Sequence, residues 1–465
     1  MRKPVANALD IDLRGGLTEK VTPHAGVALL LETARRSGVL AAAERALPTK
    51  TSPKGLRQGE MVEALVLLSA LGGDCLDDLD GLRQDYGLAA LAGYTLPAAA
   101  TARQWLDRFH DPAAVADRPR QGSFIPAETT GLVALRTVVE RTIQAYVTAV
   151  GPERSVTLDV DAHIVASSKR EALPTYTGER GDQPLVVTWA ETGLVVADEF
   201  RDGNVPASAR IQELVDTAAA ALPVRADGSG WAISVRSDSA AYEQALLDHW
   251  AERGWTFAVS ADMSLQLRAA VVALAETAWQ PWAEERDGVV REWAEVAYVP
   301  SRVAERKEQQ PYRYVAIRVR QTQGRLFGDG TPVKHFAVVS NDWAQDGQIL
   351  LEWQRGKAGT IEQVNRVLKD ELAAGVYPSG KFGANAAWLR LQVLTLNLLE
   401  LLKAVGLEPA LRQARPKRLR FAVFTQFGRV VDHARARIVR VLTGVLRTLL
   451  DPALGRLRRG PWPAT

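Results

Sequence analysis

Three acidic residues stand where a metal-dependent active site can form. Asp161 and Asp238 each lie at the carboxyl end of a predicted strand, and Glu362 lies on a predicted helix further along the chain. Carboxylate oxygens are the ligands that Mg²⁺ prefers in proteins. Two such ions, about 3.5–4 Å apart, activate an attacking oxygen and stabilise the leaving oxygen of a phosphodiester. We therefore predict a two-metal site for phosphodiester chemistry with these three carboxylates as ligands.

Each acid also has a simpler interpretation. An aspartate at a strand end commonly forms a turn, and Asp238, directly before Ser239, is a suitable cap for the next helix. Asp159 shares the predicted strand face of Asp161 and competes with it for the same role. We prefer Asp161 because it lies nearer the carboxyl end of the strand.

The third acid lies in a helical pattern over residues 360–374. At 3.6 residues per turn, one face of this helix is apolar and the other is polar. The apolar face holds Ile361, Val364, Leu368 and Leu372, and the polar face holds Glu362, Asn365, Arg366 and Lys369. Taken alone, the polar face predicts a solvated surface with an ion pair between Glu362 and Arg366.

Strands and helices alternate around the two aspartates. Strand patterns occupy residues 155–161, 184–190, 194–200, 232–238 and 255–260, and helical patterns occupy 128–150, 207–222 and 240–253. From the first strand onward the order is β-β-β-α-β-α-β, which predicts an α/β core. Sites in such sheets form beyond the carboxyl ends of strands, where Asp161 and Asp238 are expected.

The flanking segments differ from this core in texture. Short helices are predicted at residues 23–37, 59–71, 75–84 and 101–109, within a helical domain over 1–110 that is suited to DNA binding or dimerisation. The proline-rich stretch 111–127 is expected to be a linker. We divide the remainder into a first core part (128–261), a β-rich insertion (262–346), a second core part (347–402) and a basic helical region (403–465).

The expected insertion includes strand patterns at residues 312–320 and 335–340 and a concentration of aromatic residues. These aromatic side chains either build a core of their own or stack on unpaired bases.

Charge is distributed unevenly along the 465 residues. The net charge is +3, but from Lys403 to Gly460 the chain has 14 Lys/Arg against 3 Asp/Glu, a net of +11, which leaves −8 elsewhere. Arginine pairs bidentately with phosphate, so this tail favours nucleic acid over its alternative, a solvated basic helix face. The single Cys75 and the lack of a signal core or a long apolar run predict a cytoplasmic protein that does not enter a membrane.

Other chemistries find little support in the sequence. The glycine-rich stretch at residues 324–330 has no following helix and is interpreted as a hairpin rather than a phosphate-binding loop. No two histidines have helical metal-ligand spacing, which disfavours a zinc hydrolase. A Ser/His/Asp triad stays open, although the sequence has no nucleophile-elbow motif.

Several motifs in this order resemble one family, the DDE transposases of bacterial insertion sequences, in the branch called transposase DDE domain group 1. They are Thr22-Pro-His-Ala-Gly26, Leu71-Gly-Gly-Asp-Cys-Leu-Asp-Asp78, Leu158-Asp159-Val-Asp161-Ala, Phe200-Arg201-Asp-Gly203-Asn204, Arg236-Ser-Asp238-Ser, Ile361-Glu362 with Lys369, Phe382-Gly-Ala-Asn385 and Asn397-Leu-Leu. The resemblance covers most of the chain. Its three acids match Asp161, Asp238 and Glu362.

The resemblance implies an RNase H-like catalytic core interrupted by a β-rich insertion, with an N-terminal helical domain and a basic helical C-terminal region. Similar proteins bind terminal inverted repeats, cut DNA with Mg²⁺ (or Mn²⁺) and join the freed 3′-hydroxyl to target DNA, usually as homodimers on paired ends. In this chain Asp161 is expected to bridge two ions, with Asp238 and Glu362 each holding one. A bacterial cytoplasmic location at the nucleoid follows from the same resemblance.

The expected DNA contacts are Lys369, Arg366, Lys357, Arg355, Arg201, Asn204, Arg418 and Arg420. Two positions depart from the family's pattern. Ala358 stands four residues before Glu362, where a basic residue is common, and His163 stands two after Asp161, where threonine is common. Two other functions stay open: an RNase H-like nuclease that never joins strands, and a catalytically idle, transposase-derived DNA-binding protein.

Overall fold

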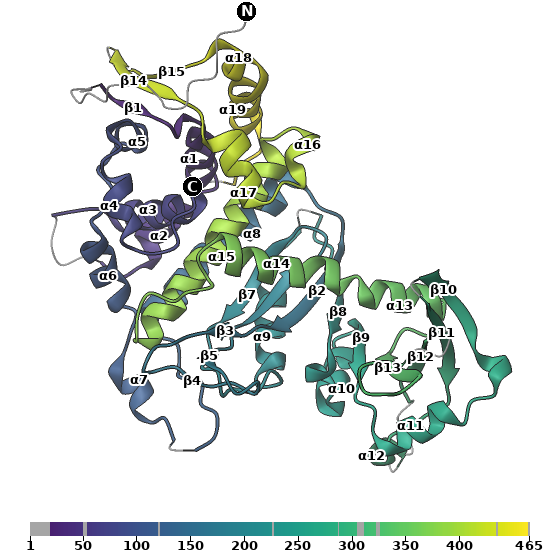
Figure 1. Ribbon diagram of the computed structural model, residues 1–465. Coiled ribbons are helices and arrows are strands. Elements are labelled where there is room, and N and C mark those ends of the chain that lie inside the picture. Colours follow the sequence, from purple (N-terminus) through teal and green to yellow (C-terminus); the bar gives the residue numbers. More distant parts are fainter. Residues whose placement is uncertain are drawn as a thin grey trace, which may run out of the picture.

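The computed structural model describes residues 19–49, 54–119, 121–225, 227–286, 288–304, 311–321, 326–433 and 436–463 (Figure 1). The first part of the predicted N-terminal domain, residues 1–18, lies outside this range. So do residues 322–325, which include the first two residues of the predicted glycine-rich hairpin.

Among the described residues, nine strands form one mixed sheet in the order β10-β11-β12-β13-β9-β8-β2-β6-β7. β2 and β9 run parallel to β8, which lies between them, and the other neighbouring pairs are antiparallel. The strands are β2 (Ser155–Ala162), β6 (Leu185–Trp189), β7 (Leu194–Glu199), β8 (Ala232–Ser237), β9 (Thr256–Ala261), β10 (Gln280–Arg286), β11 (Val289–Val296), β12 (Arg313–Gln321) and β13 (Val333–Ser340). The five strands predicted for the core are confirmed to within one residue at each end.

The strands of the predicted β-rich segment extend this sheet. β13 pairs with β9, and β12, β11 and β10 follow outward as antiparallel neighbours. The buried Trp293 packs with residues such as Ile317 and Leu350 in a hydrophobic cluster of its own, whereas Trp343 is exposed. The aromatic residues of this segment therefore contribute in part to a local core.

Alternation along the strands gives the sheet two different faces. Leu158 and Val160 of β2 pack in one cluster with Leu214 of α9 (Ile211–Ala221). Thr157, Asp159 and Asp161 point to the opposite face, because successive side chains alternate along a strand. On that face lies α14 (Lys357–Glu371), which packs against β2 and β6. The two aspartates of β2 are thus directed toward the helix that carries Glu362.

Two long helices bury much of their surface beside the sheet. They are α8 (Thr130–Val150) and α15 (Phe382–Val405), which pack against each other (Figure 1). Asn397 of α15 is fully buried and bonds the backbone of Val195 in β7 through both its side-chain atoms. Further helices are α10 (Gln244–Glu252) and α13 (Gly347–Arg355) in the two core parts and α11 (Leu265–Val272) in the expected insertion.

The N-terminal part is helical, as predicted, but has more helices than the sequence indicated. They are α1 (Ala28–Arg36), α2 (Val39–Ala46), α3 (Gln58–Ala70), α4 (Asp78–Leu82), α5 (Tyr86–Ala92) and α6 (Ala99–Asp107), of which α2 and α5 were not predicted. The predicted linker contains α7 (Pro112–Ala116), which Asp111 caps through its side chain. None of the helices in the described ranges is long and apolar enough to cross a membrane.

The basic region after Lys403 was predicted to be helical, and this prediction is wrong for two of its segments. β14 (Gly428–His433) and β15 (Ala436–Val441) form an antiparallel pair, with β1 (Val21–Thr22) on the other side of β14. β-branched residues fit a pleated, half-buried surface, and Val430 and Val439 pack inward from opposite positions. Around this pair lie α16 (Pro409–Arg412), α17 (Pro416–Leu419), α18 (Thr443–Val445) and α19 (Asp451–Arg459).

Candidate metal and nucleic-acid site

The pairing of β2 with β8 places Asp161 and Asp238 at equivalent positions on neighbouring strands. These strands are parallel, and Asp159 pairs with Arg236 in their register. Asp161 and Asp238 each lie two residues further along, at the carboxyl ends of neighbouring strands. Asp238 also accepts a hydrogen bond from the backbone N–H of Ala240 (3.1 Å), so it caps the short 3₁₀ helix that follows. Both its predicted positions, at a strand end and at a helix start, are therefore correct.

Glu362 approaches the same edge of the sheet from α14. The apolar face of this helix is buried at all four predicted positions, and Glu362, Arg366 and Lys369 are exposed on the other side. In the part of the chain that the structure describes, the Glu362 side chain has no hydrogen bond or ion pair, so the simple expectation of a pair with Arg366 is not met. Its carboxylate is free to take a ligand.

The other two acids lie close enough to affect the pKa of Asp161. Burial raises the pKa of the Asp161 carboxyl, and the negative charges of Asp238 and Glu362 raise it further. Within the described residues the three side chains do not form a closed cluster, since no group that includes them has its ligand atoms all within 4.8 Å of one another. Asp238 and Glu362 therefore influence the pKa of Asp161, but the three carboxylates do not form a closed cluster.

Two side chains of α14 hold Asp161. Lys357 lies 3.2 Å from Oδ1 through its ammonium group, and the Asn365 amide donates to Oδ2 at 3.1 Å. The attraction of Lys357 lowers the Asp161 pKa and opposes the effect of burial. A partly buried carboxylate with two further carboxylates close enough to affect its pKa is a donor set that suits a divalent metal ion.

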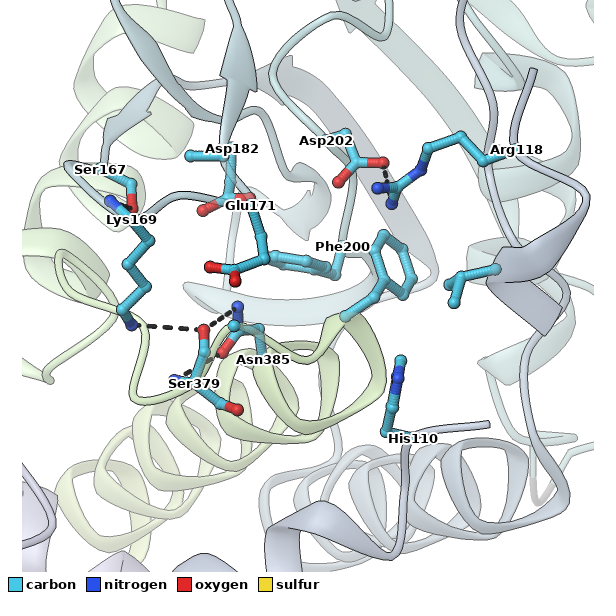
Figure 2. A pocket seen from close by; sticks show the side chains of 14 residues that line it. His110, Arg118, Ser167, Lys169, Glu171, Asp182, Phe200, Asp202, Ser379 and Asn385 are labelled. Carbon is cyan, nitrogen blue, oxygen red and sulfur yellow. Dashed lines mark hydrogen bonds and ion pairs between the residues drawn. The ribbon is translucent and has the colours of Figure 1, made fainter. Parts of the chain in front are cut away.

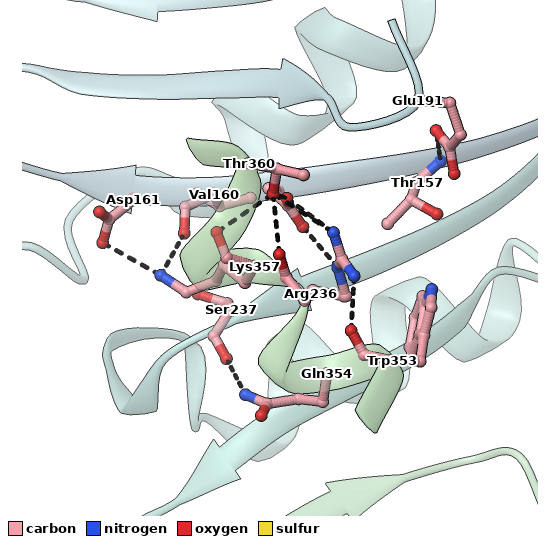
Figure 3. Close-up of polar contacts among 12 residues, drawn as sticks. Thr157, Val160, Asp161, Glu191, Arg236, Ser237, Trp353, Gln354, Lys357 and Thr360 are labelled. Atoms are coloured by element: carbon pink, nitrogen blue, oxygen red, sulfur yellow. Dashed lines mark hydrogen bonds and ion pairs between the residues drawn. The ribbon is translucent and has the colours of Figure 1, made fainter. Parts of the chain in front are cut away.

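Asp159, the rival of Asp161, has a structural role. Its fully buried carboxylate pairs with Arg236 through two hydrogen bonds, of 2.6 and 2.8 Å. Arg236 also bonds the carbonyl of Trp353 in α13, and Thr360 of α14 donates to Asp159 (Figure 3). This network joins β2, β8, α13 and α14. It therefore fixes the elements that carry all three acids.

His163 lies at the edge of this site. Neither ring nitrogen has a hydrogen-bond partner among the described residues, and the Asn365 carbonyl oxygen beside it is also buried without one. Burial and the nearby charge of Lys369 lower the pKa of His163 to about 4. The ring is therefore neutral at physiological pH, and it packs against the residue that bonds Asp161.

The predicted DNA contacts near α14 fall into different environments. Arg366 and Lys369 are exposed on the Glu362 face, as expected. Arg355 is stacked on the Trp282 ring of β10, with its guanidinium carbon 4.7 Å from the ring centre. Lys357 differs most from the expectation, because it is only 8% exposed and points at Asp161.

Arg201 and Asn204 each contact other residues of the fold. The Arg201 side chain is fully buried and pairs with Glu199 at 2.7 Å. Asn204 donates to the carbonyl of Gly122 (2.8 Å) and thereby attaches the predicted linker to the core. These contacts are structural.

The two predicted contacts of the tail also differ from each other. Arg418 lies over the exposed ring of Phe421. Arg420 donates to the carbonyls of Ala70 and Glu371, at the ends of α3 and α14, so part of its guanidinium is already engaged within the fold.

A pocket of about 220 Å³ lies apart from the three acids, between β5 (Arg180–Asp182), the segment after β7 and the start of α15 (Figure 2). Asp182 and Asp202 face each other across an isolated antiparallel bridge, and both are more than nine-tenths buried. Arg118 pairs with Asp202 at 2.6 Å. Burial and the charge of Asp202 raise the pKa of Asp182 to about 7.

No role was predicted for Arg236, Thr360 or Asn365, although the sequence contained a signal for Arg236. Arg236 precedes Asp238 by two residues and Asp159 precedes Asp161 by two, so parallel neighbouring strands place each pair on one face. An arginine and an aspartate in equivalent positions predict an ion pair. Asn365 had no comparable signal, because it shares the polar stripe of α14 with exposed residues.

The chain is similar to known proteins in two comparisons. A family model described as Transposase DDE domain group 1 matches residues 6–462. A cryo-EM structure of the piggyBac transposase synaptic complex with hairpin DNA is similar at a TM-score of 0.41 and 12% identity, covering 84% of this chain and 78% of that one. A likeness this weak assigns no function. A comparison with curated proteins finds no match.

Proposed function

The chain belongs to the transposase DDE domain group 1 family, and on this premise we propose that it cuts and joins DNA with Asp161, Asp238 and Glu362 as its catalytic acids. It would bind the terminal inverted repeats of its element, cleave phosphodiester bonds and transfer the freed 3′-hydroxyl to target DNA. The observation that supports this proposal is the register of β2 and β8: Asp159 pairs with Arg236, so Asp161 and Asp238 follow at the carboxyl ends of neighbouring parallel strands, and α14 packs against β2.

Divalent metal ions are the general cofactors of DDE transposases, and Mg²⁺ is the ion proposed for this chain. Asp161, Asp238 and Glu362 would hold the metal through their carboxylates. When bound, the metal supplies an activated water or hydroxyl and neutralises charge on the leaving oxygen. Burial and the negative charges of Asp238 and Glu362 raise the pKa of the Asp161 carboxyl, and a cation bound beside it would oppose this effect.

The exposed face of α14 extends this site toward the DNA. Arg366 lies one turn after Glu362 and Lys369 lies two turns after it, and all three are exposed. Cations at these positions would contact the phosphates that flank the scissile bond and hold the strand in place. Catalysis of phosphoryl transfer depends largely on such positioning and on charge stabilisation.

The architecture proposed for this activity is an RNase H-like core formed by the central strands, α14 and α15. Residues 262–346 would be an insertion into that core, and the N-terminal helices would contribute to DNA binding or dimerisation. We propose a homodimer on paired ends, because joining two ends to one target requires two active sites.

The test is cleavage of a labelled duplex that contains the DNA flanking the gene. The variants Asp161→Asn, Asp238→Asn and Glu362→Gln each keep the shape of the side chain and remove its charge. We expect each to lose Mg²⁺-dependent cleavage and strand joining while still binding the duplex. Asp370→Asn is the matched control, since Asp370 is an exposed acid on the same helix. Full Mg²⁺-dependent cutting by any of the three variants would remove that residue from the site.

A further inference from the structure

The sheet formed by β1, β14 and β15 has one covered face and one open face. Val430 is buried, and its opposite neighbour Val439 packs against the same hydrophobic core. Arg429 precedes Val430 in β14, and Arg440 follows Val439 in β15. Because side chains alternate along a strand, both arginines point to the opposite face, where they are exposed. This open face, which we call the ribbon face, consists of Arg429, Val431, Ile438 and Arg440 (β14 and β15 in Figure 1).

The two arginines of the ribbon face are directly opposite each other across the strand pair. Like charges directly opposite each other destabilise a sheet, and a negatively charged partner would offset this repulsion. Arg429 pairs with Glu19 at 3.1 Å. No carboxylate in the described part of the chain pairs with Arg440. The face thus has positive charge that the fold itself does not neutralise.

Apolar side chains surround these arginines. Ile438 is 40% exposed, and Phe427 and Leu442, just outside the two strands, are 63% and 68% exposed. Arginine beside exposed aromatic and aliphatic groups is typical of a surface that another macromolecule covers.

We propose that the ribbon face docks duplex DNA, with Arg429 and Arg440 on its phosphates. The inference rests on the proposed function, because it takes DNA as the partner. It adds a second DNA-binding surface, on β14 and β15, apart from the three acids. A two-stranded β-ribbon fits the major groove of B-DNA, and several DNA-binding proteins insert strands there. The charge of the face is complementary to the phosphate backbone.

A second copy of this chain fits the same face poorly. A twofold dimer brings the same patch of both copies together, so Arg429 and Arg440 would meet the identical pair. Four arginines would then face each other without an acid to neutralise Arg440. A polyanion removes this repulsion, which is why the charge pattern favours DNA.

The structure separates this face from the other arginines of the tail. Arg420 already donates to backbone carbonyls, and Arg437 on the opposite side of the hairpin lies 3.5 Å from Asp432. Arg437 therefore provides a matched control, because it lies on the same strand as Arg440 but points away from the ribbon face.

The test measures binding of the full chain to an end-containing duplex across a range of salt concentrations. Each phosphate contact contributes about 0.9 to the slope of log affinity against log salt. We expect the slope to become less steep by about 1 for Arg440→Ala and by about 2 for Arg429→Ala/Arg440→Ala. Arg437→Ala should keep the wild-type slope, and so should Arg429→Lys/Arg440→Lys, which retains both charges.

An unchanged slope in the double alanine variant, with a melting temperature like that of the wild type, would overturn the proposal. So would a change in oligomeric state, measured by light scattering, without a change in slope. Cleavage by the same preparations separates this inference from the proposed function. If the wild type cuts and the slope does not change, only the ribbon proposal fails; if the slope changes but no metal-dependent cutting occurs, only the proposed catalysis fails.

Discussion

The side-chain amide of Asn365 lies 3.1 Å from Oδ2 of Asp161 and holds the first acid from the helix that carries the third. Asn365 is itself buried, three residues after Glu362. It therefore links the position of Asp161 to that of α14. We regard it as a positioning residue, since it acts through Asp161.

Asn365→Ala is expected to lower the rate of Mg²⁺-dependent cleavage by about 10–100-fold, the usual range for residues that orient metal ligands. The apparent affinity for Mg²⁺ should fall as well, while the affinity for DNA stays unchanged. Cleavage rates measured against Mg²⁺ concentration check this, with Gln363→Ala on the same helix as control. A variant with wild-type metal dependence would show that Asp161 does not need this amide.

Arg236→Ala is expected to destabilise the protein by about 3–5 kcal/mol, because it leaves the buried Asp159 carboxylate without its partner. Arg236→Met combined with Asp159→Leu should recover a large part of this loss, since no charge then stays buried. The free energy of unfolding in urea measures both effects. If the double variant were as unstable as the single one, the contacts of Arg236 with α13 would outweigh its pair with Asp159.

The raised pKa of Asp182 predicts a pH dependence of stability. With a native pKa of about 7, this carboxyl keeps its proton in the folded state between about pH 4 and 7, where the unfolded chain has lost it. The free energy of unfolding contributed by this group is therefore present below about pH 4 and is lost as the pH rises to 7. Asp182→Asn, which has no proton to lose, should be more stable than the wild type by ~1 kcal/mol or more above pH 7.

Urea unfolding at pH 4.5, 6 and 7.5 compares Asp182→Asn with the wild type. The difference in stability should grow with pH. A constant difference across these pH values would mean that Asp182 ionises normally in the folded protein.

The central strands and α14 were predictable because the spacing of apolar residues within each segment is enough to identify it as a strand or a helix. Period two identified β2 and β8, and period 3.6 placed Ile361 and Leu368 on the buried face of α14. Asp161 was preferred over Asp159 on its place in the strand, and the ion pair of Asp159 with Arg236 is consistent with that choice.

The remaining features depend on contacts between distant segments. Whether Lys357 meets DNA or Asp161 is decided by how α14 crosses β2, which no local pattern records. The strands β14 and β15 were missed because the arginines between their valines suggested a basic helix. Arg420 and Arg440 are the same residue type in one basic tail, yet Arg420 donates to backbone carbonyls whereas Arg440 is exposed.

This difference between arginines leads to the last prediction. Lys369 is exposed on the Glu362 face, so Lys369→Ala should remove one phosphate contact and make the slope of log affinity against log salt less steep by about 1. Arg420→Ala should leave that slope unchanged and instead lower the free energy of unfolding by ~1–3 kcal/mol, because buried carbonyls lose their donor. Salt titrations and urea unfolding of both variants check the two effects. A flatter slope for Arg420→Ala would mean that this guanidinium leaves its carbonyls to bind DNA, and an unchanged slope for Lys369→Ala would place the DNA strand away from α14.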